Sequence, residues 1–549
     1  MSKIKIFSLG GLNENGKNMY IVEVDKDIFV FDAGLKYDSE LNLGIDYIIP
    51  NIDYLIKNKK RIKGIFLTHG HDSNMGAIPD ILDSLSGVEV FATKLTMDIL
   101  KSKITTDSKK YKLNEIKPHV KLSFGKNSIF PISITHSIPD AVCYVLYTKD
   151  GAIVYTGDFT MDVTATANYK TDIGKLAYVG KQGVLCLLSE SLYADRVGHT
   201  SPNNRVSSFI REVLIRNENR IIATVMPAHF YRIQEIFDEV SKTNRKLIIM
   251  GKSLQQMINM ALKNGYLSID KTRIGDLSNI DEKNCIILIS DEKEKPFANL
   301  ERIIKGYDKY IKLTDTDTIF ITEPSYPGIE KRMALIMDEV AMLGANAISL
   351  SSKKHLLHHA SREDLMMMLN LMNPKYYFPV IGEYRHQYAN GEVAEAMGMP
   401  RENIILKENG DVALFVNGNL EDSNEHIDVD DVLIDGTTSE DVGDLVLKDR
   451  EMLGSSGIVI VSTTLDKKTK KIVGGPEILT RGFIYVKESQ ELLTETKELA
   501  RSVIEENIIP NSLRVDYSKI KTDVRDVLGK FFYKETESKP MIITVIQEV

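Results

Sequence analysis

Two histidines stand two positions apart in the stretch THGHDSNMGAIPD, which covers residues 68–80. His69 and His71 follow a short apolar run at 64–67 that is typical of a β-strand. Alternate residues at a strand end point the same way, so both imidazoles can reach one point. Imidazole is a preferred ligand of zinc, and catalytic zinc sites keep one position open for water. The spacing therefore indicates part of a metal site.

Two further candidate ligands also follow strand-like apolar runs. They are His136 in THSIPDA and Asp158 in VYTGDFT. Loops at the ends of neighbouring strands collect at one rim of a sheet, which is where sites form in α/β proteins. A single histidine is more often a structural residue than a ligand. Four such residues at strand ends together favour a shared metal site.

The composition is that of a globular protein without strong attraction for polyanions. The chain has 549 residues, of which 43% are hydrophobic and 27% charged, with a formal net charge of -8. Bulk charge therefore does not attract nucleic acid, and any polyanion would need a local basic patch. The stretch at 101–126, with eight lysines, and KKTKK at 467–471 are candidates, although solvated loops explain them more simply.

Cysteine usage and the lack of long apolar stretches both indicate a reducing, cytoplasmic compartment. Cys143, Cys186 and Cys285 are widely spaced in apolar runs, as expected of buried thiols in a reducing environment. The N-terminus lacks the apolar core of a signal peptide, and no stretch is long enough to span a bilayer. We expect a cytoplasmic protein that has no membrane partner.

The order of predicted elements indicates an insertion. Strand-like runs dominate up to about residue 200, and helix and strand patterns then alternate, which is the signature of a parallel α/β domain. The strand-like YYFPVIGE at 376–383 resembles the first part again. The segment at 417–444 has ten acidic residues and no Lys or Arg, which suggests a poorly packed connector. The predicted domains are 1–205 together with 357–416, an inserted domain at 206–356, an acidic linker at 417–450, and a C-terminal α+β domain for assembly at 451–549.

Motifs along the whole chain resemble the ribonuclease J family of metallo-β-lactamase/β-CASP ribonucleases. They include GGLNENGKNMY (10–20), THGHDSNMGAIP (68–79), VYTGDF (154–159), GPEILTRGFIYVKES (475–489) and PMIITVIQEV (540–549). The resemblance implies an α/β fold: an αββα sandwich with an inserted parallel β-CASP domain and a C-terminal α+β module. It also implies single-stranded RNA as substrate, and roles in mRNA decay and rRNA maturation.

The resemblance assigns the candidate ligands to one of two metal positions. The family motif is His-x-His-x-Asp-His with later His and Asp ligands, so His69, His71, His136 and Asp158 match one metal, Zn or Mn, and Asp158 could bridge to a second. The positions expected to complete the second site hold Ser73, Asn74 and Ile381. A hydroxyl and an amide bind divalent metals weakly and isoleucine not at all. We therefore expect one divalent metal at most and no second metal.

The region HLLHHASREDL at 355–365 matches a family segment that contacts phosphate. The resemblance implies that His355 and His359 contact the RNA phosphate or transfer a proton. The family's small Ser-Gly pair is Leu357 and His358 here, which narrows the space for phosphate. His358 could also serve as a metal ligand, but nothing near it in the sequence supports that role. Asp72 is a possible substitute ligand too, although its place on the loop aims it differently.

Two more segments differ from the family on the RNA side. PAHFYR (227–232) keeps Arg232, an expected RNA contact, but His229 and Tyr231 replace other residues. SDEKEKP (290–296) replaces a glycine-rich loop, and its acidic residues would repel a phosphate; they are Asp291, Glu292 and Glu294.

These departures give one leading hypothesis and several alternatives. The pattern is similar to that of the degenerate second paralogue of some Gram-positive bacteria. It suggests a weak or inactive RNA-binding subunit that partners an active ribonuclease J paralogue, as a homo- or hetero-oligomer through the C-terminal domain. An active metal-dependent 5′–3′ exoribonuclease, with or without endonuclease activity, is the first alternative. A one-metal hydrolase of a small ester or nucleotide is the second, and a purely structural cluster is the third.

Overall fold

The chain folds into two compact units. The computed structural model describes residues 2–549 apart from 38–43, 166, 201–204, 291–295, 327–328, 356, 436–437, 442–443, 485–488 and 509–514. The larger unit ends at Ser439, and the smaller one consists mainly of residues 440–549. Among the described residues, no helix is both long enough and apolar enough to cross a membrane.

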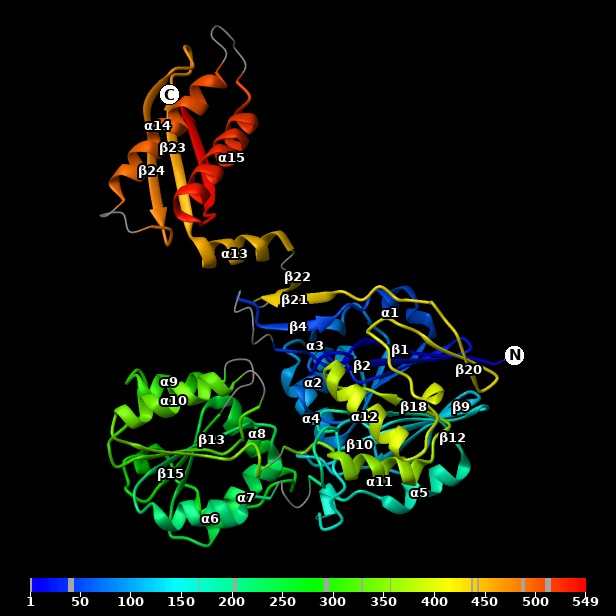
Figure 1. Ribbon diagram of the computed structural model, residues 1–549. Helices are drawn as coiled ribbons and strands as arrows, with labels where there is room; N and C mark the ends of the chain where they lie inside the picture. The colour runs from blue at the N-terminus through cyan, green and yellow to red at the C-terminus, as the bar shows by residue number, and fades with distance from the viewer. Residues whose placement is uncertain are drawn as a thin grey trace. The chain divides into compact units, whose positions relative to one another are not determined.

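Two sheets lie face to face in the larger unit (Figure 1). The first has the order β20-β19-β1-β2-β3-β5-β6-β7, and the second the order β18-β12-β11-β10-β9-β8. The first consists of β1 (Lys3–Gly10), β2 (Met19–Val24), β3 (Asp27–Phe31), β5 (Ile62–Phe66), β6 (Glu89–Thr93), β7 (Lys112–Ile116), β19 (Ala413–Val416) and β20 (Asn419–Glu421). The second consists of β8 (Leu122–Phe124), β9 (Asn127–Ser133), β10 (Val142–Thr148), β11 (Gly151–Tyr155), β12 (Val184–Ser189) and β18 (Tyr376–Pro379).

Alternation along the strands builds the core of this sandwich. In β2, Tyr20 and Val22 enter the cluster between the sheets, while Met19 and Ile21 pack under the helices on the outer face. Aromatic rings fill the space between the sheets, with Phe31 5.9 Å from Tyr155, centroid to centroid. Helices cover both outer faces: α1 (Asp53–Lys57), α2 (Asp72–Met75), α3 (Ile78–Ile81) and α4 (Lys94–Lys103) on one, and α5 (Ile173–Gln182), α11 (Arg362–Met372) and α12 (Tyr384–Ala396) on the other. The predicted αββα sandwich is confirmed.

A parallel sheet of five strands is inserted between β12 and β18 in the sequence, with the order β14-β15-β13-β16-β17 (Figure 1). Its strands are β13 (Ile221–Val225), β14 (Leu247–Met250), β15 (Ile286–Ser290), β16 (Thr318–Ile321) and β17 (Asn346–Ser349). Ile221 and Ala223 pack against helices on one face, and Ile222 against helices on the other, so both faces are covered. The helices are α6 (Ser207–Arg216), α7 (Phe230–Ser241) and α8 (Lys252–Lys263) on the first face, and α9 (Ala298–Ile304) and α10 (Glu330–Met342) on the second. The predicted parallel α/β insertion is confirmed.

The acidic segment that follows the sandwich contains strands. Beyond β20, it includes β21 (Asp431–Asp435), which pairs antiparallel with β4 (Tyr47–Pro50), and β22 (Thr438–Asp441) follows. Asp431 also forms an ion pair with the buried Lys17. The expected connector is therefore partly ordered on the larger unit.

The smaller unit is an α+β module, as predicted. Its three strands, in the order β24-β23-β25, are β23 (Ile458–Leu465), β24 (Ile472–Arg481) and β25 (Met541–Glu548). Its helices are α13 (Asp444–Ser456), α14 (Gln490–Glu506) and α15 (Tyr517–Thr536). Val459 and Val461 pack with Ile504 and Phe532 under α14 and α15, which leaves the other sheet face without these helices.

Candidate metal centre

Strand direction explains why residues distant in the sequence meet at one rim of the sandwich. His69 and His71 follow β5, His136 follows β9, and Asp158 follows β11. Strand β10 is antiparallel to both β9 and β11, so β9 and β11 end at the same edge of their sheet. The order of the strands therefore places the predicted ligands together.

Four nitrogen and oxygen atoms converge there. His71 Nδ1 lies 3.1 Å from His69 Nε2 and 3.1 Å from His136 Nε2. Asp158 Oδ2 lies 3.5 Å from His69 Nε2 and 4.0 Å from His136 Nε2. All these ligand atoms lie within 4.8 Å of one another. Except for the half-buried His71, the four side chains are buried.

This donor set fits a divalent metal. Ligand atoms about 2.0–2.1 Å from a tetrahedral ion lie roughly 3.3 Å apart, close to the separations observed. Three imidazoles and one carboxylate are also the ligand types that suit Zn²⁺ or Mn²⁺. His69, His71, His136 and Asp158 could therefore hold one ion without large rearrangement, although the ligand assignment stays a prediction.

Hydrogen bonds orient two of the imidazoles. His136 Nδ1 donates to the backbone carbonyl of His358 at 2.8 Å, which leaves Nε2 free of its proton and directed at the cluster. His69 Nδ1 lies 3.0 Å from Thr68 Oγ1. Burial holds the pKa of His136 well below its usual value, and the neighbouring His69 lowers it further. His136 is therefore a neutral imidazole at physiological pH, as a metal ligand must be.

At the positions expected to hold a second metal, the polar side chains form hydrogen bonds with one another and with Asp32. Ser73 Oγ donates to Asn74 Oδ1 at 2.7 Å, and Asn74 Nδ2 donates to Asp32 Oδ2 at 2.8 Å. Asp32 also accepts from Tyr155 and Thr68. Burial raises the pKa of Asp32 and these hydrogen bonds offset part of the rise, so the net pKa is about 6. The polar groups in this half bind one another.

Ile381 contributes only hydrocarbon to the same rim. It follows β18 and is 1% exposed. Its φ is +57°, a left-handed conformation that is an outlier for a β-branched residue. Its N–H lies 3.1 Å from the carbonyl of Gly11. The backbone is thus held in a strained conformation by its neighbours.

Asp72 does not take the place of the missing ligands. Its Oδ1 accepts from Lys103 Nζ at 2.6 Å, and its Oδ2 accepts from Tyr37 at 2.6 Å. The carboxylate is therefore bound to α4 and to the loop after β3, as its place in the loop suggested.

His359 lies beside the cluster, in contact with a glutamate. Its ring centroid is 5.6 Å from that of His136, and its Nδ1 lies 2.8 Å from Glu190 Oε2. Glu190 follows β12 and accepts from the backbone N–H groups of Phe159 and Ala360. Burial raises the pKa of Glu190 well above its usual value. Asp158, Glu190 and His359 also form a second group of potential ligands.

The other two predicted RNA contacts lie elsewhere. The His355 ring packs on Phe209, with centroids 5.4 Å apart, and its Nδ1 accepts from Ser351 N–H. Arg232 is 0% exposed, and its Nη1 donates to Glu235 at 2.7 Å. The structure does not bring either into the cluster, and their contact with RNA stays a prediction.

Three of the unusual residues on the RNA side lie in contact, with His358 between the other two. His358 is 1% exposed, and its Nδ1 lies 3.3 Å from His229 Nε2. The Tyr231 ring lies 4.8 Å from that of His358, centroid to centroid. Burial holds the pKa of His358 well below its usual value. The acidic residues Asp291, Glu292 and Glu294 lie outside the described residues.

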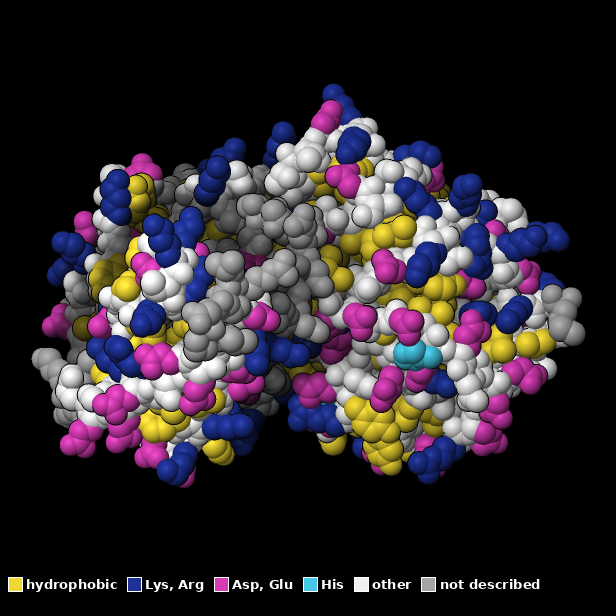
Figure 2. Space-filling model, turned by 90° about the horizontal axis from the view of Figure 1, so that it is seen from above, with side chains coloured by type: hydrophobic (Ala, Val, Ile, Leu, Met, Phe, Trp, Pro, Cys, Tyr) yellow, Lys and Arg dark blue, Asp and Glu magenta, His cyan; other side chains and the backbone are white. Residues whose placement is uncertain are grey.

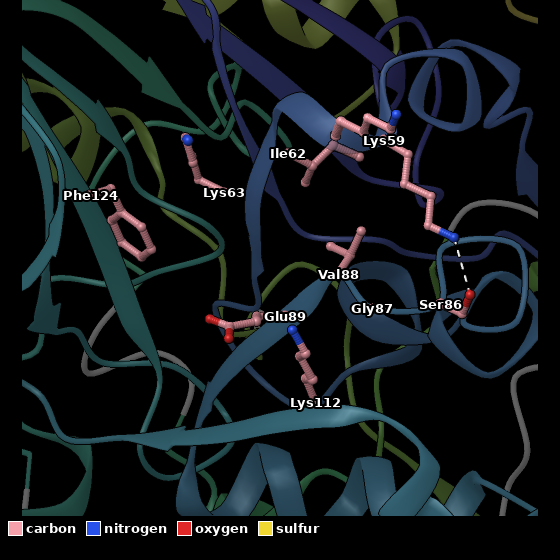
Figure 3. Close-up of a pocket in the computed structure, with 10 residues that line it drawn as sticks. Lys59, Ile62, Lys63, Ser86, Gly87, Val88, Glu89, Lys112 and Phe124 are labelled. Carbon is pink, nitrogen blue, oxygen red and sulfur yellow. Dashed lines mark hydrogen bonds between the residues drawn. The ribbon is translucent and has the colours of Figure 1, made fainter.

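A lysine-lined pocket of about 400 Å³ lies at the opposite end of the strands (Figure 3). Its lining includes the first residues of β5, β6 and β7, whereas the histidines follow the end of β5. Lys59 Nζ donates to Ser86 Oγ at 3.1 Å, and Glu89 offsets part of the charge. The pocket lies at the start of β5 and is therefore separate from the metal centre, which lies beyond the end of that strand. On the face drawn in Figure 2, the described Lys and Arg side chains are interspersed with Asp and Glu.

Three carboxylates of this region were not predicted from the sequence. Asp32 comes directly after β3 and Glu190 directly after β12. Glu323 comes after β16, with one residue between. The runs DIFVFD, VLCLLSE and TIFITE carry the same signal that identified Asp158. Applying that rule to every acid at a strand end would have found all three.

Profiles of four known families match the chain. They are the Metallo-beta-lactamase superfamily (12–166), the Ribonuclease J beta-CASP domain (218–340), the Zn-dependent metallo-hydrolase RNA specificity domain (351–406) and the Ribonuclease J C-terminal domain (445–549). Their order agrees with the order of the folded parts.

Curated relatives match the full length. Ribonuclease J2 of Bacillus subtilis (strain 168) is 40% identical, covering 100% of this chain and 99% of the relative. Ribonuclease J 2 of Staphylococcus aureus (strain MRSA252) is 37% identical, covering 100% of this chain and 98% of the relative. A crystal structure of a protein of unknown function from Enterococcus faecalis V583 covers 76% of this chain and 100% of its own, with a TM-score of 0.53 and 14% identity, and so supports the fold alone.

Proposed function

Because the chain belongs to the ribonuclease J family, we propose that it is an RNA-binding subunit with weak or no hydrolysis of its own, which partners an active ribonuclease J paralogue. Its place would be in mRNA decay and rRNA maturation. The family is one of RNA-specific metallo-hydrolases, and the RNA specificity domain covers residues 351–406. This domain supports RNA as the ligand, and we propose the single-stranded form.

One observation carries the proposal of weak hydrolysis. The side chains at the second metal position are Ser73, Asn74 and Ile381, and the two polar ones are engaged with each other and with Asp32. A two-metal phosphodiesterase stabilises the attacking and the leaving oxygen together. Each ion can contribute several kcal/mol, so loss of one could cost on the order of a thousandfold in rate.

The remaining residues could still perform part of the reaction. A divalent ion bound by His69, His71, His136 and Asp158 would lower the pKa of a bound water and polarise a phosphoryl oxygen. His359, held at Nδ1 by Glu190, lies beside the cluster, where it could contact a phosphate or transfer a proton. His71 and His359 are only partly buried, which supports access of a ligand to this centre.

A second candidate function is a genuine 5′–3′ exoribonuclease that works with one metal. The complete three-histidine cluster and the adjacent Glu190–His359 pair favour it. This alternative predicts measurable RNA hydrolysis by the isolated chain, lost when the cluster is removed.

The smaller unit offers a surface for the partner. Ile460 in β23 pairs with Leu479 in β24 and Ile543 in β25, so these three side chains form a row on one sheet face. Leu479 is 55% exposed and Ile543 41% exposed. Helices α14 and α15 cover the opposite face. Exposed apolar side chains in a row support docking of another protein here.

Assembly can be tested by co-purification. The chain and the active ribonuclease J paralogue of the same cell are co-expressed, one of them tagged, and analysed by size exclusion. We expect a complex that the double variant Leu479→Glu, Ile543→Glu weakens at least tenfold. A matched control, Tyr533→Glu, alters a 52% exposed residue of α15 and should leave the complex intact. Failure of the unaltered chain to bind the paralogue would contradict the subunit role.

A further inference from the structure

Residues 357–360 are held from two sides by buried glutamates. On the sandwich side, Glu190 binds His359 Nδ1 and accepts from the N–H of Ala360. On the side of the inserted domain, the side chain of His358 reaches His229, which contacts Glu323. This short segment therefore joins the metal centre to the insertion.

The contacts on the insertion side form a continuous chain of hydrogen bonds. Glu323 Oε1 lies 2.6 Å from His229 Nδ1, and His229 Nε2 lies 3.3 Å from His358 Nδ1. An ionised carboxylate can only accept, so His229 Nδ1 carries a proton, and in neutral His229 the Nε2 is then the acceptor. His358 Nδ1–H must then donate to it. The exposed fractions of Glu323, His229 and His358 are 3%, 5% and 1%.

The chain ends on a candidate metal ligand. The carbonyl oxygen of His358 accepts from His136 Nδ1 at 2.8 Å, and His136 Nε2 lies in the cluster. A partner of this kind fixes both the tautomer and the ring orientation of a metal-binding histidine. Since the side chain of His358 is anchored, the position of its carbonyl depends on His229 and Glu323.

We propose that Glu323, His229 and His358 are positioning residues that orient His136, so that the inserted domain sets how tightly the histidine cluster binds a divalent metal. His229 lies at the start of α7 and Glu323 just after β16, both within the insertion. Movement of the insertion would thus change metal affinity without any contact between the insertion and the ion. The inference rests on metal binding by the cluster, which belongs to the proposed function.

The test is the affinity of the full-length chain for Co²⁺, followed by its visible absorption and by calorimetry. We expect His229→Ala and His358→Gly each to raise the Kd for Co²⁺ about tenfold, the lower end of what loss of an outer partner costs. His229→Gln places an acceptor near the position of Nε2, so it should restore most of the affinity. His426→Ala is the matched control: His426 is exposed and its Nδ1 lies 2.9 Å from Asp411, outside the cluster.

A purely structural role would lower thermal stability but leave the Kd and the spectrum of folded variants unchanged. Circular dichroism identifies the folded variants, and Glu323→Gln provides a conservative variant should His229→Ala not fold. Folded variants that bind Co²⁺ as tightly as the unaltered chain would overturn this inference but not metal binding by the cluster. An unaltered chain that binds no Co²⁺ would overturn metal binding by the cluster as well.

Discussion

The two halves of the candidate centre share one rim but differ in what their side chains offer. His69, His71 and His136 present ring nitrogens about 3.1 Å apart, next to Asp158. In the other half, the backbone is equally well fixed: the carbonyls of residues 72, 73 and 74 accept from backbone N–H groups of residues 35, 18 and 33. What differs is the side chains of Ser73, Asn74 and Ile381, which lack a carboxylate or imidazole donor. A well-ordered backbone therefore does not by itself supply a metal site.

The largest effect should come from rebuilding the second half. The triple variant Ser73→Asp, Asn74→His, Ile381→His supplies three donors on the existing backbone. We expect metal content to rise from one ion per chain to two, and RNA hydrolysis to increase on the order of a thousandfold. Elemental analysis and RNA decay measure the two effects. Ser73→Ala is the control without a donor, and two bound ions without a faster reaction would show that the second half does not limit hydrolysis.

Removing a ligand from the first half should have the next largest effect. His71→Ala deletes the imidazole whose Nδ1 lies 3.1 Å from both other histidines. Loss of outer partners alone costs about 10–100-fold in affinity, so loss of a ligand should cost at least about a hundredfold. Calorimetry with Zn²⁺ or Mn²⁺ provides the measurement. An unchanged Kd would mean that the ion, if bound, lies elsewhere.

Asp32, beneath the altered half, should make stability depend on pH. Its folded pKa of about 6 exceeds the ordinary value of 3.8, so the folded state holds the proton more tightly. This proton contributes about 2–3 kcal/mol to the free energy of unfolding. The contribution is fully present below about pH 4 and is lost as the pH rises through about 6. Denaturant unfolding at several pH values should show this loss, and Asp32→Asn should lack it. Parallel curves for the two proteins would contradict the assignment.

The smallest effect concerns strain at Ile381. Ile381→Leu keeps the volume but removes the branch at Cβ, which is unfavourable at φ +57°. We expect a gain of less than about 1 kcal/mol in the free energy of unfolding. Ile381→Val keeps the branch and removes a buried methyl, so it should lose about 1 kcal/mol. If the Leu variant were the less stable of the two, relief of backbone strain would not outweigh the change in side-chain packing.

The sequence could predict the sheets and the cluster because both depend on local patterns. Apolar runs marked the strands, and the rule that loops meet at strand ends brought His69, His71, His136 and Asp158 together. The alternation of helix and strand from about residue 205 likewise predicted the inserted parallel sheet.

Contacts between distant segments could not be predicted in this way. Nothing near His358 in the sequence indicates that it meets His229, which is 129 residues away and in the insertion. His355 and Arg232 match the family motif by position, yet one packs on Phe209 and the other is buried with Glu235. Burial and side-chain direction depend on the packing of helices, which residue spacing alone does not contain.

The most direct test of the central claim is the decay of 5′-monophosphorylated single-stranded RNA by the purified chain. It is measured with Mn²⁺, Mg²⁺ or Zn²⁺, beside the double variant His71→Ala, Asp158→Ala as a control for contaminating nuclease. The subunit account predicts equal, near-zero decay by both proteins, while both still bind the RNA. Rapid decay by the unaltered chain that the double variant lacks would contradict it, and would show that the surviving half is a working catalyst.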